Sequence, residues 1–428
     1  MEMYTTPHAL SDYLDRPLTC DCGRTHYAAL QYVSICSGAV AALRDLCRDA
    51  KTVLVISDEN TFAAAGQAAL AALDGKKILR VTYPGDHLVV PDEAAVAAME
   101  PFLGQADALV GIGAGVIQDL AKYGASLGHI PCHIVATAPS MDGYASTGAA
   151  MIMGGMKVTY SVPIPNSILA DTAVLKDAPM ELIRAGYGDI VGKFSALNDW
   201  KLSSVVKGEY FCQRVYDLMD AALQKTLSLA DGLARRDEEA VGALMEALVL
   251  AGVAMALAGN SRPASGSEHH LSHFFETTGL LEKQPYLPHG IDVAYSTVIT
   301  AQLRQKLLSK PFPTTAVAFD RADWAANMHR IYSTTAEGYM DLQDKVGHYA
   351  ADRMAAYLGR EEEIRAVLAE VPAPEEIDAM LRAVGLDMAE FYRLYNSQKL
   401  RDAVLYAKDI KDRYSVLWMY WDLLRDKE

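Results

Sequence analysis

The chain has 428 residues, more than one ordinary domain holds, so we expect two domains with sizeable cores. Hydrophobic residues make up 51% of it, which is typical of a globular protein and excludes a disordered one. The formal net charge of −15 argues against a nucleic-acid partner or an anionic membrane surface, because both require a basic field.

Strand and helix patterns alternate in the first part of the chain. A helix is predicted at 38–49, and short apolar runs predict strands at 52–57, 77–83, 108–112 and 133–136. Helices are expected between them at 62–73 and 92–102. A hairpin around Gly154-Gly155 and a strand at 167–170 close this half. The alternation indicates an α/β fold with a doubly wound parallel sheet.

Two segments at strand ends are candidates for ligand binding. The strand at 108–112 runs into Gly113-Ala114-Gly115, where the backbone can approach a phosphate at a helix N-terminus. A tight strand-to-helix turn is the alternative, because the full GxGxxG spacing is missing. The hydroxyl-rich loop at 137–146 follows the next strand, and ligands bind beyond the carboxyl ends of such strands.

Helical periodicity dominates from about residue 179, so we divide the chain into domains at 1–178 and 179–428. Helices are predicted at 213–233, 238–257, 297–308, 322–345 and 350–358, and a further group follows the proline-rich linker at 372–376. Within this half, Asp189 lies among small residues, where a carboxylate can either face a cleft or cap a helix. The apolar run at 247–259 is shorter than the about 20 residues that span a bilayer, so we expect a buried helix and no membrane span.

Histidines concentrate in one short window of the second half. Of the 11 in the chain, four lie between His269 and His289, where about half of one is expected by chance. His269 and His273 are four residues apart and share one helix face, and Ser265 or Ser267 is a candidate N-cap for that helix. Solvated histidines on a capped helix are the alternative to a metal or catalytic site, because no HExxH signature is present.

Cysteines are few, at 6 in 428 residues, and no secretory signal precedes them, so we expect a reduced cytoplasmic location. Cys20-Asp21-Cys22 with His26 resembles a metal knuckle. It lacks a second cysteine pair at suitable spacing, and for that reason we favour an ordinary N-terminal segment.

Taken together, four segments resemble the sn-glycerol-1-phosphate dehydrogenases, within the superfamily of metal-dependent alcohol dehydrogenases and dehydroquinate synthases. The segments are 111–119, 137–146, 186–193 and 262–273 with His289, and the most specific strings are SMDGYAS at 140–146 and SGSEH at 265–269. The resemblance implies a Rossmann-like N-terminal domain and an all-helical C-terminal domain, the dehydroquinate synthase-like fold. It agrees with the division made above from periodicity.

The resemblance also implies site residues. One divalent metal, zinc or nickel, would be held by Asp189, His269 and His289, an open arrangement typical of catalytic sites. Asp142 and His273 would be catalytic and would bind the substrate together with Asp189. NAD or NADP would be bound by Asp58, Gly115, Val116, Ile117, Gln118, Asp119, Thr137, Ala138, Pro139, Ser140 and Ser146.

The implied reaction is the reduction of dihydroxyacetone phosphate to sn-glycerol 1-phosphate with NAD(P)H, a step of phospholipid metabolism. Arg262, Lys157 and Lys193 are candidate partners of the substrate phosphate, and surface solubility is the alternative role for each. A homodimer is expected from the large apolar helical half.

Three alternatives remain. One is a glycerol or polyol dehydrogenase of the same superfamily acting on an unphosphorylated substrate. Another is a dehydroquinate synthase-like lyase, whose first metal ligand is typically a glutamate, so that Asp189 argues against it. A non-catalytic metal-binding scaffold is the last, and the co-occurrence of cofactor and metal signals in the expected order argues against that.

Overall fold

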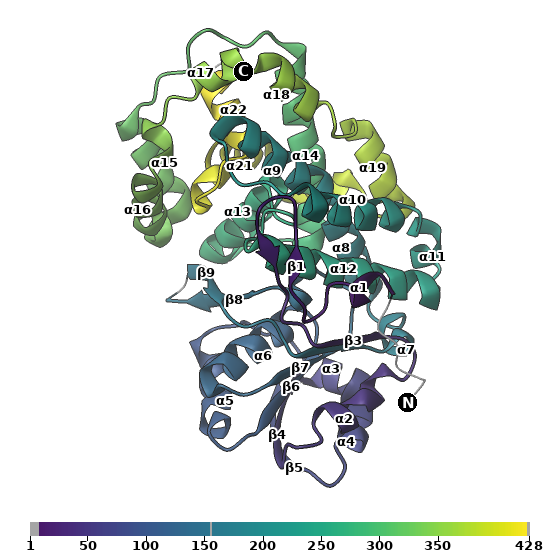
Figure 1. Cartoon of the computed structure of the whole chain (residues 1–428). Helices are drawn as coiled ribbons and strands as arrows, with labels where there is room; N and C mark the ends of the chain where they lie inside the picture. The colour runs from purple at the N-terminus through teal and green to yellow at the C-terminus, as the bar shows by residue number, and fades with distance from the viewer. Residues whose placement is uncertain (1–7, 155, 426–428) are drawn as a thin grey trace. The chain divides into compact units, whose positions relative to one another are not determined.

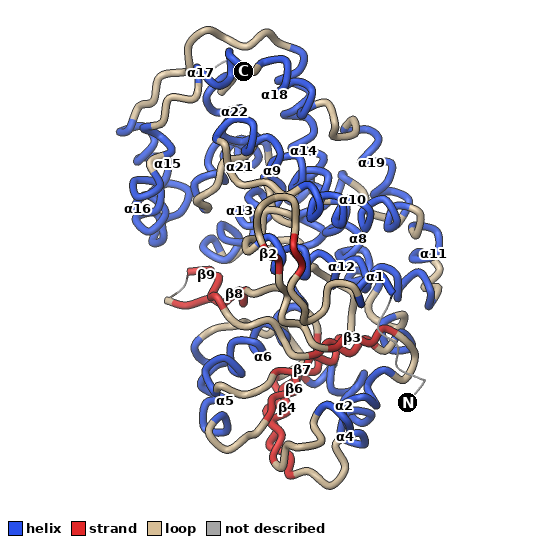
Figure 2. Tube along the Cα trace, viewed as in Figure 1, coloured by secondary structure: helices blue, strands red, loops and turns tan. Residues whose placement is uncertain are grey.

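The computed structural model describes residues 8–154 and 156–425. Contacts divide the chain into two compact units. The sheet unit comprises the residues up to Ile190 together with Gln224–Ser261, and the helical unit comprises Val191–Leu223 with Arg262 onward. Among the described residues, every strand belongs to the sheet unit (Figure 2).

The sheet unit is built on a parallel sheet of six strands in the order β3-β10-β7-β6-β4-β5 (Figure 1). The four residues Val53–Ile56 at the centre of β4 are completely buried, which explains the uninterrupted apolar run, because a parallel sheet is covered on both faces. The strands are β3 (Tyr32–Ile35), β4 (Thr52–Asp58), β5 (Lys77–Tyr83), β6 (Ala108–Gly113), β7 (Cys132–Ala136) and β10 (Ser167–Ala170).

The strand order reverses between β4 and β6. The chain passes from β4 to its neighbour β5 on one side and then to β6 on the other side of β4. In doubly wound sheets, ligands bind beyond the carboxyl ends of the strands at such a reversal. The predicted α/β architecture is confirmed, and the end of β6 is placed where a dinucleotide is expected.

Helices cover both faces of this sheet. Figure 1 shows α5 (Glu93–Leu103) and α6 (Gly115–Gly128) on one face, and α2 (Leu43–Leu46) and α4 (Gln67–Ala72) on the other. The predicted hairpin is also present, as β8 (Gly148–Met153) and β9 (Met156–Ser161), with Gly154 at φ 60 and Gly155 outside the described residues.

One long apolar helix belongs to the sheet unit although it lies late in the sequence. This helix, α12 (Glu238–Ala258), is long and apolar enough to cross a membrane by length and composition, yet 78% of its most apolar window is buried. It packs against α7 (Thr172–Leu175) and against the short helix η3 (Gly143–Ala145) of the hydroxyl-rich loop. The buried helix expected at 247–259 is therefore a core helix of this unit.

The helical unit has two helices at its centre. They are α13 (Ser267–Glu282) and α14 (His289–Ser309), which pack against each other. The helices around them are α9 (Lys193–Lys207), α10 (Gln213–Leu227), α15 (Arg321–Tyr332), α16 (Ala336–Val346), α17 (Met354–Gly359), α18 (Glu361–Leu368), α19 (Pro374–Ala383), α20 (Met388–Leu394), α21 (Ser397–Tyr406) and α22 (Val416–Leu423).

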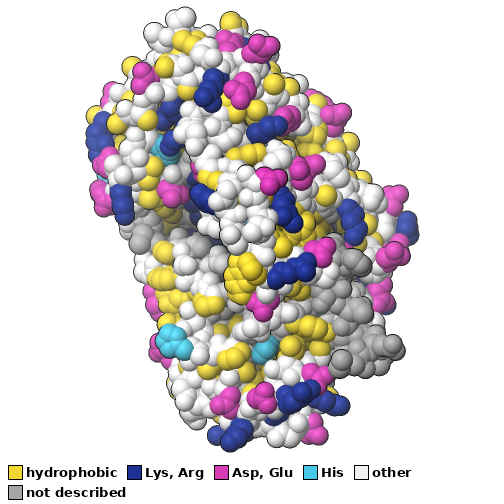
Figure 3. Space-filling model, viewed as in Figure 1, with side chains coloured by type: hydrophobic (Ala, Val, Ile, Leu, Met, Phe, Trp, Pro, Cys, Tyr) yellow, Lys and Arg dark blue, Asp and Glu magenta, His cyan; other side chains and the backbone are white. Residues whose placement is uncertain are grey.

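Several regions differ from the sequence-based prediction, and the single helices predicted at 213–233 and 322–345 are each interrupted, at 228–229 and at 333–335. The short edge strand β3 was not predicted, because Ser34 interrupts its apolar run. The helix predicted at 297–308 begins at His289 as α14, eight residues earlier, since Pro288 occupies its N-cap position. On the face drawn in Figure 3, Lys and Arg side chains are interspersed among Asp and Glu.

Candidate active site

The segment predicted to bind a dinucleotide lies where β6 meets α6. Ala114 is the N-cap residue of α6 and makes no side-chain cap hydrogen bond, so the first N–H groups of the helix have no side chain competing for them. The loop after β7 lies alongside, since Thr137 N donates to Gly113 O at 3.3 Å. The arrangement suits an anionic group at the helix N-terminus.

Gln118 lies in the first turn of α6, and Asp119 follows it. Gln118 is completely buried; its Nε2 donates to Asp119 Oδ1 at 2.6 Å, and its Oε1 has no hydrogen-bond partner among the described residues. Burial raises the pKa of Asp119, and the nearby Lys122 ammonium opposes that rise. A buried acceptor without a donor is costly, and a bound polar ligand would satisfy it.

Lys122 is a buried residue beside this segment that the sequence analysis did not single out. Its side chain is buried, and its Nζ donates to Gly143 O at 2.9 Å, to Ser146 Oγ at 3.1 Å and to Gly148 O, and pairs with Asp119 at 3.1 Å. The Lys122 ammonium thus connects α6 to the loop after β7. A lysine within a helix is normally read from sequence as solvated, so no signal indicated this role.

We expect Lys122→Met to raise the dissociation constant of NADH about tenfold or more. The substitution leaves buried carbonyl oxygens without a donor, at about 1–3 kcal/mol each, and 1.4 kcal/mol corresponds to a tenfold change in affinity. Fluorescence titration with NADH measures the effect, with Lys77→Met at the exposed start of β5 as the matched control. Equal affinity for NADH in the two variants would show that Lys122 does not position the loop at 137–146 for cofactor binding.

The hydroxyl-rich loop is held by close backbone packing. Tyr144 is buried and its hydroxyl donates to Ala138 O at 2.6 Å. A Cβ at Gly186, on α8 (Met180–Val191), would lie 1.9 Å from Pro139 O, and one at Gly252, on α12, would lie 2.7 Å from the Cβ of Ala145. Only glycine allows these two helices to approach the loop so closely.

Asp142, Asp189 and Asp58 all belong to the sheet unit. Asp189 on α8 is completely buried, and its Oδ2 accepts a hydrogen bond of 2.9 Å from the backbone N–H of Asp142, which links α8 to the loop. Asp58 lies at the carboxyl end of β4, where its Oδ1 caps α3 (Glu59–Thr61) by accepting from Thr61 N at 2.8 Å. Its contact with a ribose stays a prediction.

In the helical unit, three of the predicted histidines come together. His269 and His273 lie one turn apart on α13, and His289 is the first residue of α14. The ring centroids are 5.1 Å apart for His269 and His289, 5.5 Å for His273 and His289, and 6.1 Å for His269 and His273. Ligand nitrogens of His269 and His289 lie within 4.8 Å of each other.

Neighbouring side chains orient both predicted histidine ligands. His269 Nδ1 lies 2.7 Å from Oε1 of the buried Glu268, so Nδ1 carries the proton and Nε2 offers a lone pair. Ser272 Oγ lies 3.2 Å from His289 Nδ1 and 3.4 Å from His289 O. When Ser272 donates to the carbonyl, its Oγ accepts from Nδ1, and Nε2 of His289 is again the nitrogen left for a ligand.

The predicted serine caps of α13 were wrong. The N-cap residue is Gly266 and makes no side-chain cap bond. Asp199 of α9 takes over the role, because its Oδ2 accepts from Ser267 N at 2.6 Å, and Glu268 Oε1 accepts from Gly266 N at 2.9 Å. A carboxylate from another helix satisfies the orphan donors more strongly than a local hydroxyl.

Arg262 and Lys193, two of the candidate phosphate partners, are buried, so surface solubility is not their role. Arg262 Nε donates to Glu209 at 2.8 Å and Nη1 to Tyr414 O at 2.6 Å, while Lys193 Nζ donates to Ala264 O at 3.0 Å. Such contacts give both residues a structural role. His270 is fully buried, and burial together with Arg413, Lys411 and Arg262 holds its pKa well below the usual value.

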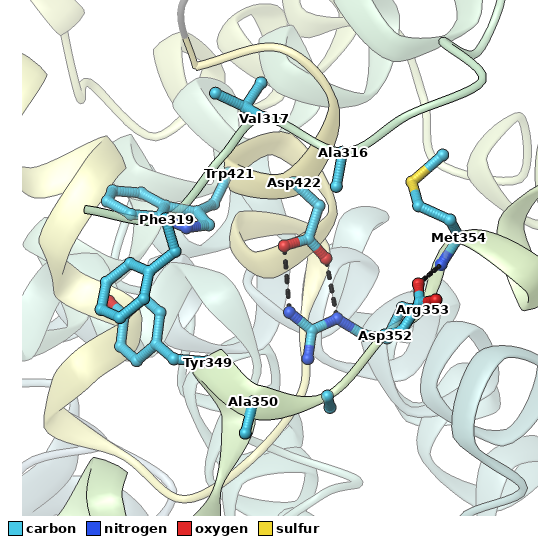
Figure 4. Close-up of a pocket in the computed structure, with 11 residues that line it drawn as sticks. Ala316, Val317, Phe319, Tyr349, Ala350, Asp352, Arg353, Met354, Trp421 and Asp422 are labelled. Atoms are coloured by element: carbon cyan, nitrogen blue, oxygen red, sulfur yellow. Dashed lines mark hydrogen bonds and ion pairs between the residues drawn. The ribbon is translucent and has the colours of Figure 1, made fainter. Parts of the chain in front are cut away.

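A cavity of about 280 Å³ lies elsewhere in the helical unit. Phe319, Tyr349 and Trp421 line it beside Arg353, which makes a bidentate ion pair with Asp422 at 2.7 and 3.0 Å (Figure 4). None of the predicted site residues lines this cavity, so it is not part of the candidate active site.

Comparison with known proteins agrees with these features. Residues 34–179 match the family model described as iron-containing alcohol dehydrogenase. A glycerol-1-phosphate dehydrogenase [NAD(P)+] of Geobacillus stearothermophilus is 30% identical, over 86% of each chain. The chain belongs to the glycerol-1-phosphate dehydrogenase family. It is therefore an oxidoreductase, and the resemblance noted in the sequence is confirmed.

Other similar proteins align with almost the whole length of this chain. The enzyme of the same name from Bacillus licheniformis is 29% identical over 95% of this chain and 93% of its own. An archaeal halo-thermophilic alcohol dehydrogenase from a Red Sea brine pool has a TM-score of 0.60 at 13% identity, covering 94% of this chain and 99% of its own. A sulfoacetaldehyde reductase from Bifidobacterium kashiwanohense, solved with NAD+, also scores 0.60, at 14% identity, over 94% and 98%. The two solved structures establish the fold.

Proposed function

We propose that this family member reduces dihydroxyacetone phosphate to sn-glycerol 1-phosphate with NADH or NADPH. The observation that carries the proposal is the 30% identity, over 86% of both chains, to a relative named glycerol-1-phosphate dehydrogenase [NAD(P)+]. The loops and histidines described above supply groups suited to that chemistry. Within this proposal, we place the enzyme in the cytoplasm and expect a homodimer, which size-exclusion chromatography with light scattering tests.

The sheet unit fits a nicotinamide dinucleotide. The N-terminus of α6 accommodates the pyrophosphate, and the orphaned Gln118 Oε1 provides a buried acceptor for a donor of the cofactor. Asp58 at the end of β4 is the proposed ribose contact. Gly115–Asp119, Thr137–Ser140 and Ser146 are the remaining proposed contacts. Reduced nicotinamide supplies the hydride in such enzymes, and the protein orients the reactants.

The donor set fits a catalytic divalent metal. We propose Asp189, His269 and His289 as its ligands. Two imidazoles with fixed tautomers and one buried carboxylate leave a coordination position for substrate, as in catalytic rather than closed structural sites. The metal supplies Lewis-acid polarisation of a carbonyl oxygen. Asp189 precedes by only two residues the point where the chain enters the helical unit, which supports its inclusion.

The remaining residues orient the substrate and handle the proton. His273 lies one turn from His269 with a half-buried ring, so one of its nitrogens is suited to hold the proton that the product hydroxyl needs. Asp142 is 8% exposed, and its backbone N–H is fixed by Asp189. We propose the Asp142 carboxylate as a second substrate contact.

A phosphorylated substrate requires cations, which this acidic protein must concentrate locally. Lys411 and Arg413 lie close enough to the α13 histidine His270 to lower its pKa, and Arg413 Nη1 donates to Ser265 O at 3.3 Å. We propose these two half-buried side chains as the partners of the phosphate. In this role Lys411 and Arg413 replace Arg262 and Lys193, because the side chains of Arg262 and Lys193 bond to other groups of the protein.

A substrate panel tests the function. We expect NADH oxidation with dihydroxyacetone phosphate, loss of that activity after chelation and its return with nickel or zinc. With unphosphorylated dihydroxyacetone, kcat/KM should be lower by about tenfold to a hundredfold, because hydrogen bonds to a charged group contribute about 1.5–3 kcal/mol. Equal or greater activity on dihydroxyacetone would favour the polyol dehydrogenase alternative. Absence of net NADH consumption would favour the lyase.

The variant Lys411→Ala tests the proposed contact with the substrate phosphate. It should raise KM for dihydroxyacetone phosphate and leave turnover of dihydroxyacetone unchanged. Lys345→Ala, an exposed position on α16, is the matched control. A KM that does not respond to Lys411→Ala would remove this residue from the phosphate site without affecting the assignment of the reaction.

A further inference from the structure

The N-terminal hairpin carries a group of soft metal ligands outside the site described above. It consists of β1 (Leu18–Thr19) and β2 (Thr25–His26), which pair antiparallel with Leu18 opposite His26. Each strand has two residues, and an isolated two-stranded hairpin is marginally stable at best. An additional interaction that closes the hairpin is therefore expected.

Three ligand atoms converge at the loop end of this hairpin. The sulfurs of Cys20 and Cys22 and a ring nitrogen of His26 all lie within 4.8 Å of one another. Cys22 Sγ and His26 Nε2 are 3.3 Å apart. Gly23 turns the loop with φ 83 and donates its N–H to Cys20 O at 3.1 Å, which directs both cysteines to one side. None of the six cysteines, all within the described residues, forms a disulfide.

The orientation of His26 favours a metal. Its Nδ1 lies 2.6 Å from the carbonyl oxygen of Leu257 on α12, and because a carbonyl only accepts, Nδ1 must carry the proton. Nε2, which faces Cys22, therefore holds a lone pair. A ligand histidine whose other nitrogen donates to a backbone carbonyl is the usual arrangement around protein-bound metals. His26 is 2% exposed, so its ring is shielded from bulk water.

We propose that Cys20, Cys22 and His26 bind a zinc ion distinct from the catalytic metal. Zinc prefers tetrahedral sites of cysteine sulfur and histidine nitrogen, and three such ligands leave one coordination position. Thiolates in a reducing compartment bind metals rather than form disulfides. The proposal reverses the preference for an ordinary segment, which rested on the absence of a second cysteine pair.

The other cysteines of the sheet unit are not candidates for this ion. Cys47 and Cys132 lie in the core of the unit, where burial raises the thiol pKa to about 11 and about 12. Cys36 Sγ lies 3.5 Å from the hydroxyl of Ser34. Cys36 therefore serves as the control for the experiment.

Metal analysis in a background without the catalytic metal tests the proposal. In His289→Ala protein we expect zinc to remain, bound as a single ion per chain. Replacing that zinc with cobalt should give the near-ultraviolet charge-transfer absorption of cobalt–thiolate bonds, which a site of one carboxylate and two imidazoles lacks. Adding Cys20→Ser or Cys22→Ser should abolish or strongly reduce this absorption, whereas Cys36→Ser, the matched control, should retain it.

The sulfur-specific signal keeps this test independent of the reaction. Absence of the charge-transfer absorption in the His289→Ala protein, or its persistence in Cys22→Ser, would overturn the zinc site whatever the enzyme reduces. Because a variant of this hairpin can fail to fold, the wild-type enzyme provides a second measurement. A mercurial thiol reagent should release zinc, detected with a colorimetric chelator, and no release would contradict the proposal.

Discussion

Replacing His269 with alanine is expected to lower kcat/KM by about a thousandfold or more and to reduce the metal content of the purified protein. The Lewis-acid contribution of a metal is several kcal/mol, and each 1.36 kcal/mol is a tenfold change in rate. The His269 ring, fixed by Glu268 at 2.7 Å, holds Nε2 in place for the metal. Steady-state NADH oxidation and elemental analysis on the same preparation measure both effects.

The control for this prediction is His329→Ala. His329 is on α15, and its side chain is 52% exposed beside Glu337, so its loss should change neither activity nor metal content. His289→Ala should behave like His269→Ala, because both side chains are proposed ligands of one ion. An active His269→Ala enzyme with a full complement of catalytic metal would refute the ligand assignment. Glu268→Gln should give a smaller loss, about 10–100-fold, as for other groups that orient a ligand.

Replacing Asp199 with alanine is expected to destabilise the helical unit by about 3–5 kcal/mol, the cost of breaking a buried ion pair. Its Oδ1 accepts from Arg304 Nη2 at 2.8 Å and from Val416 N at 2.8 Å, and its Oδ2 caps α13 through Ser267 N at 2.6 Å. The side chains of Asp199 and Arg304 are 0% and 2% exposed. Removal of the carboxylate leaves the buried Arg304 guanidinium without its counter-ion and two backbone N–H groups without an acceptor.

Urea denaturation followed by circular dichroism measures this loss, and metal affinity should fall in parallel because α13 carries His269. Asp344→Ala is the matched control, since Asp344 pairs with Arg321 at 2.6 Å on the surface, with side chains 48% and 57% exposed. Exposed pairs contribute little, so its denaturation midpoint should hardly change. Equal shifts in both variants would show that burial does not determine the contribution of this ion pair.

The regular part of the fold follows from residue patterns. The strands at 77–83 and 167–170 were predicted with the bounds of β5 and β10, because each is a short apolar run between polar residues. The edge strand β3 has no such pattern. The helix α12 was predicted from its apolar length, but its packing against the loop at 143–145 depends on Gly252 and Ala145, which lie far apart in sequence.

The candidate site likewise contains residues that the sequence indicates and residues that it does not. The clustering of His269, His273 and His289 was indicated by their spacing, and the structure brings their rings together. The residues that hold the site had no sequence signal. Lys122 and Asp199 are charged residues that sequence reasoning assigns to solvent, and each is buried by contacts with segments 21 or more residues away. A buried charged side chain needs partners, and partners that lie far away in the sequence can be identified only in the folded chain.

The boundaries of the two units have a practical consequence for protein engineering. The chain changes unit after Ile190, again after Leu223 and again after Ser261, so the units share three covalent connections instead of one linker. A single truncation therefore cannot isolate either unit, since a cut between Ile190 and Glu238 separates α12 from the strands of its own unit. Two of these connections adjoin Asp189 and the segment leading to His269. Affinity tags are thus best placed at the chain ends, whereas fragment complementation and domain exchange have to take all three connections into account.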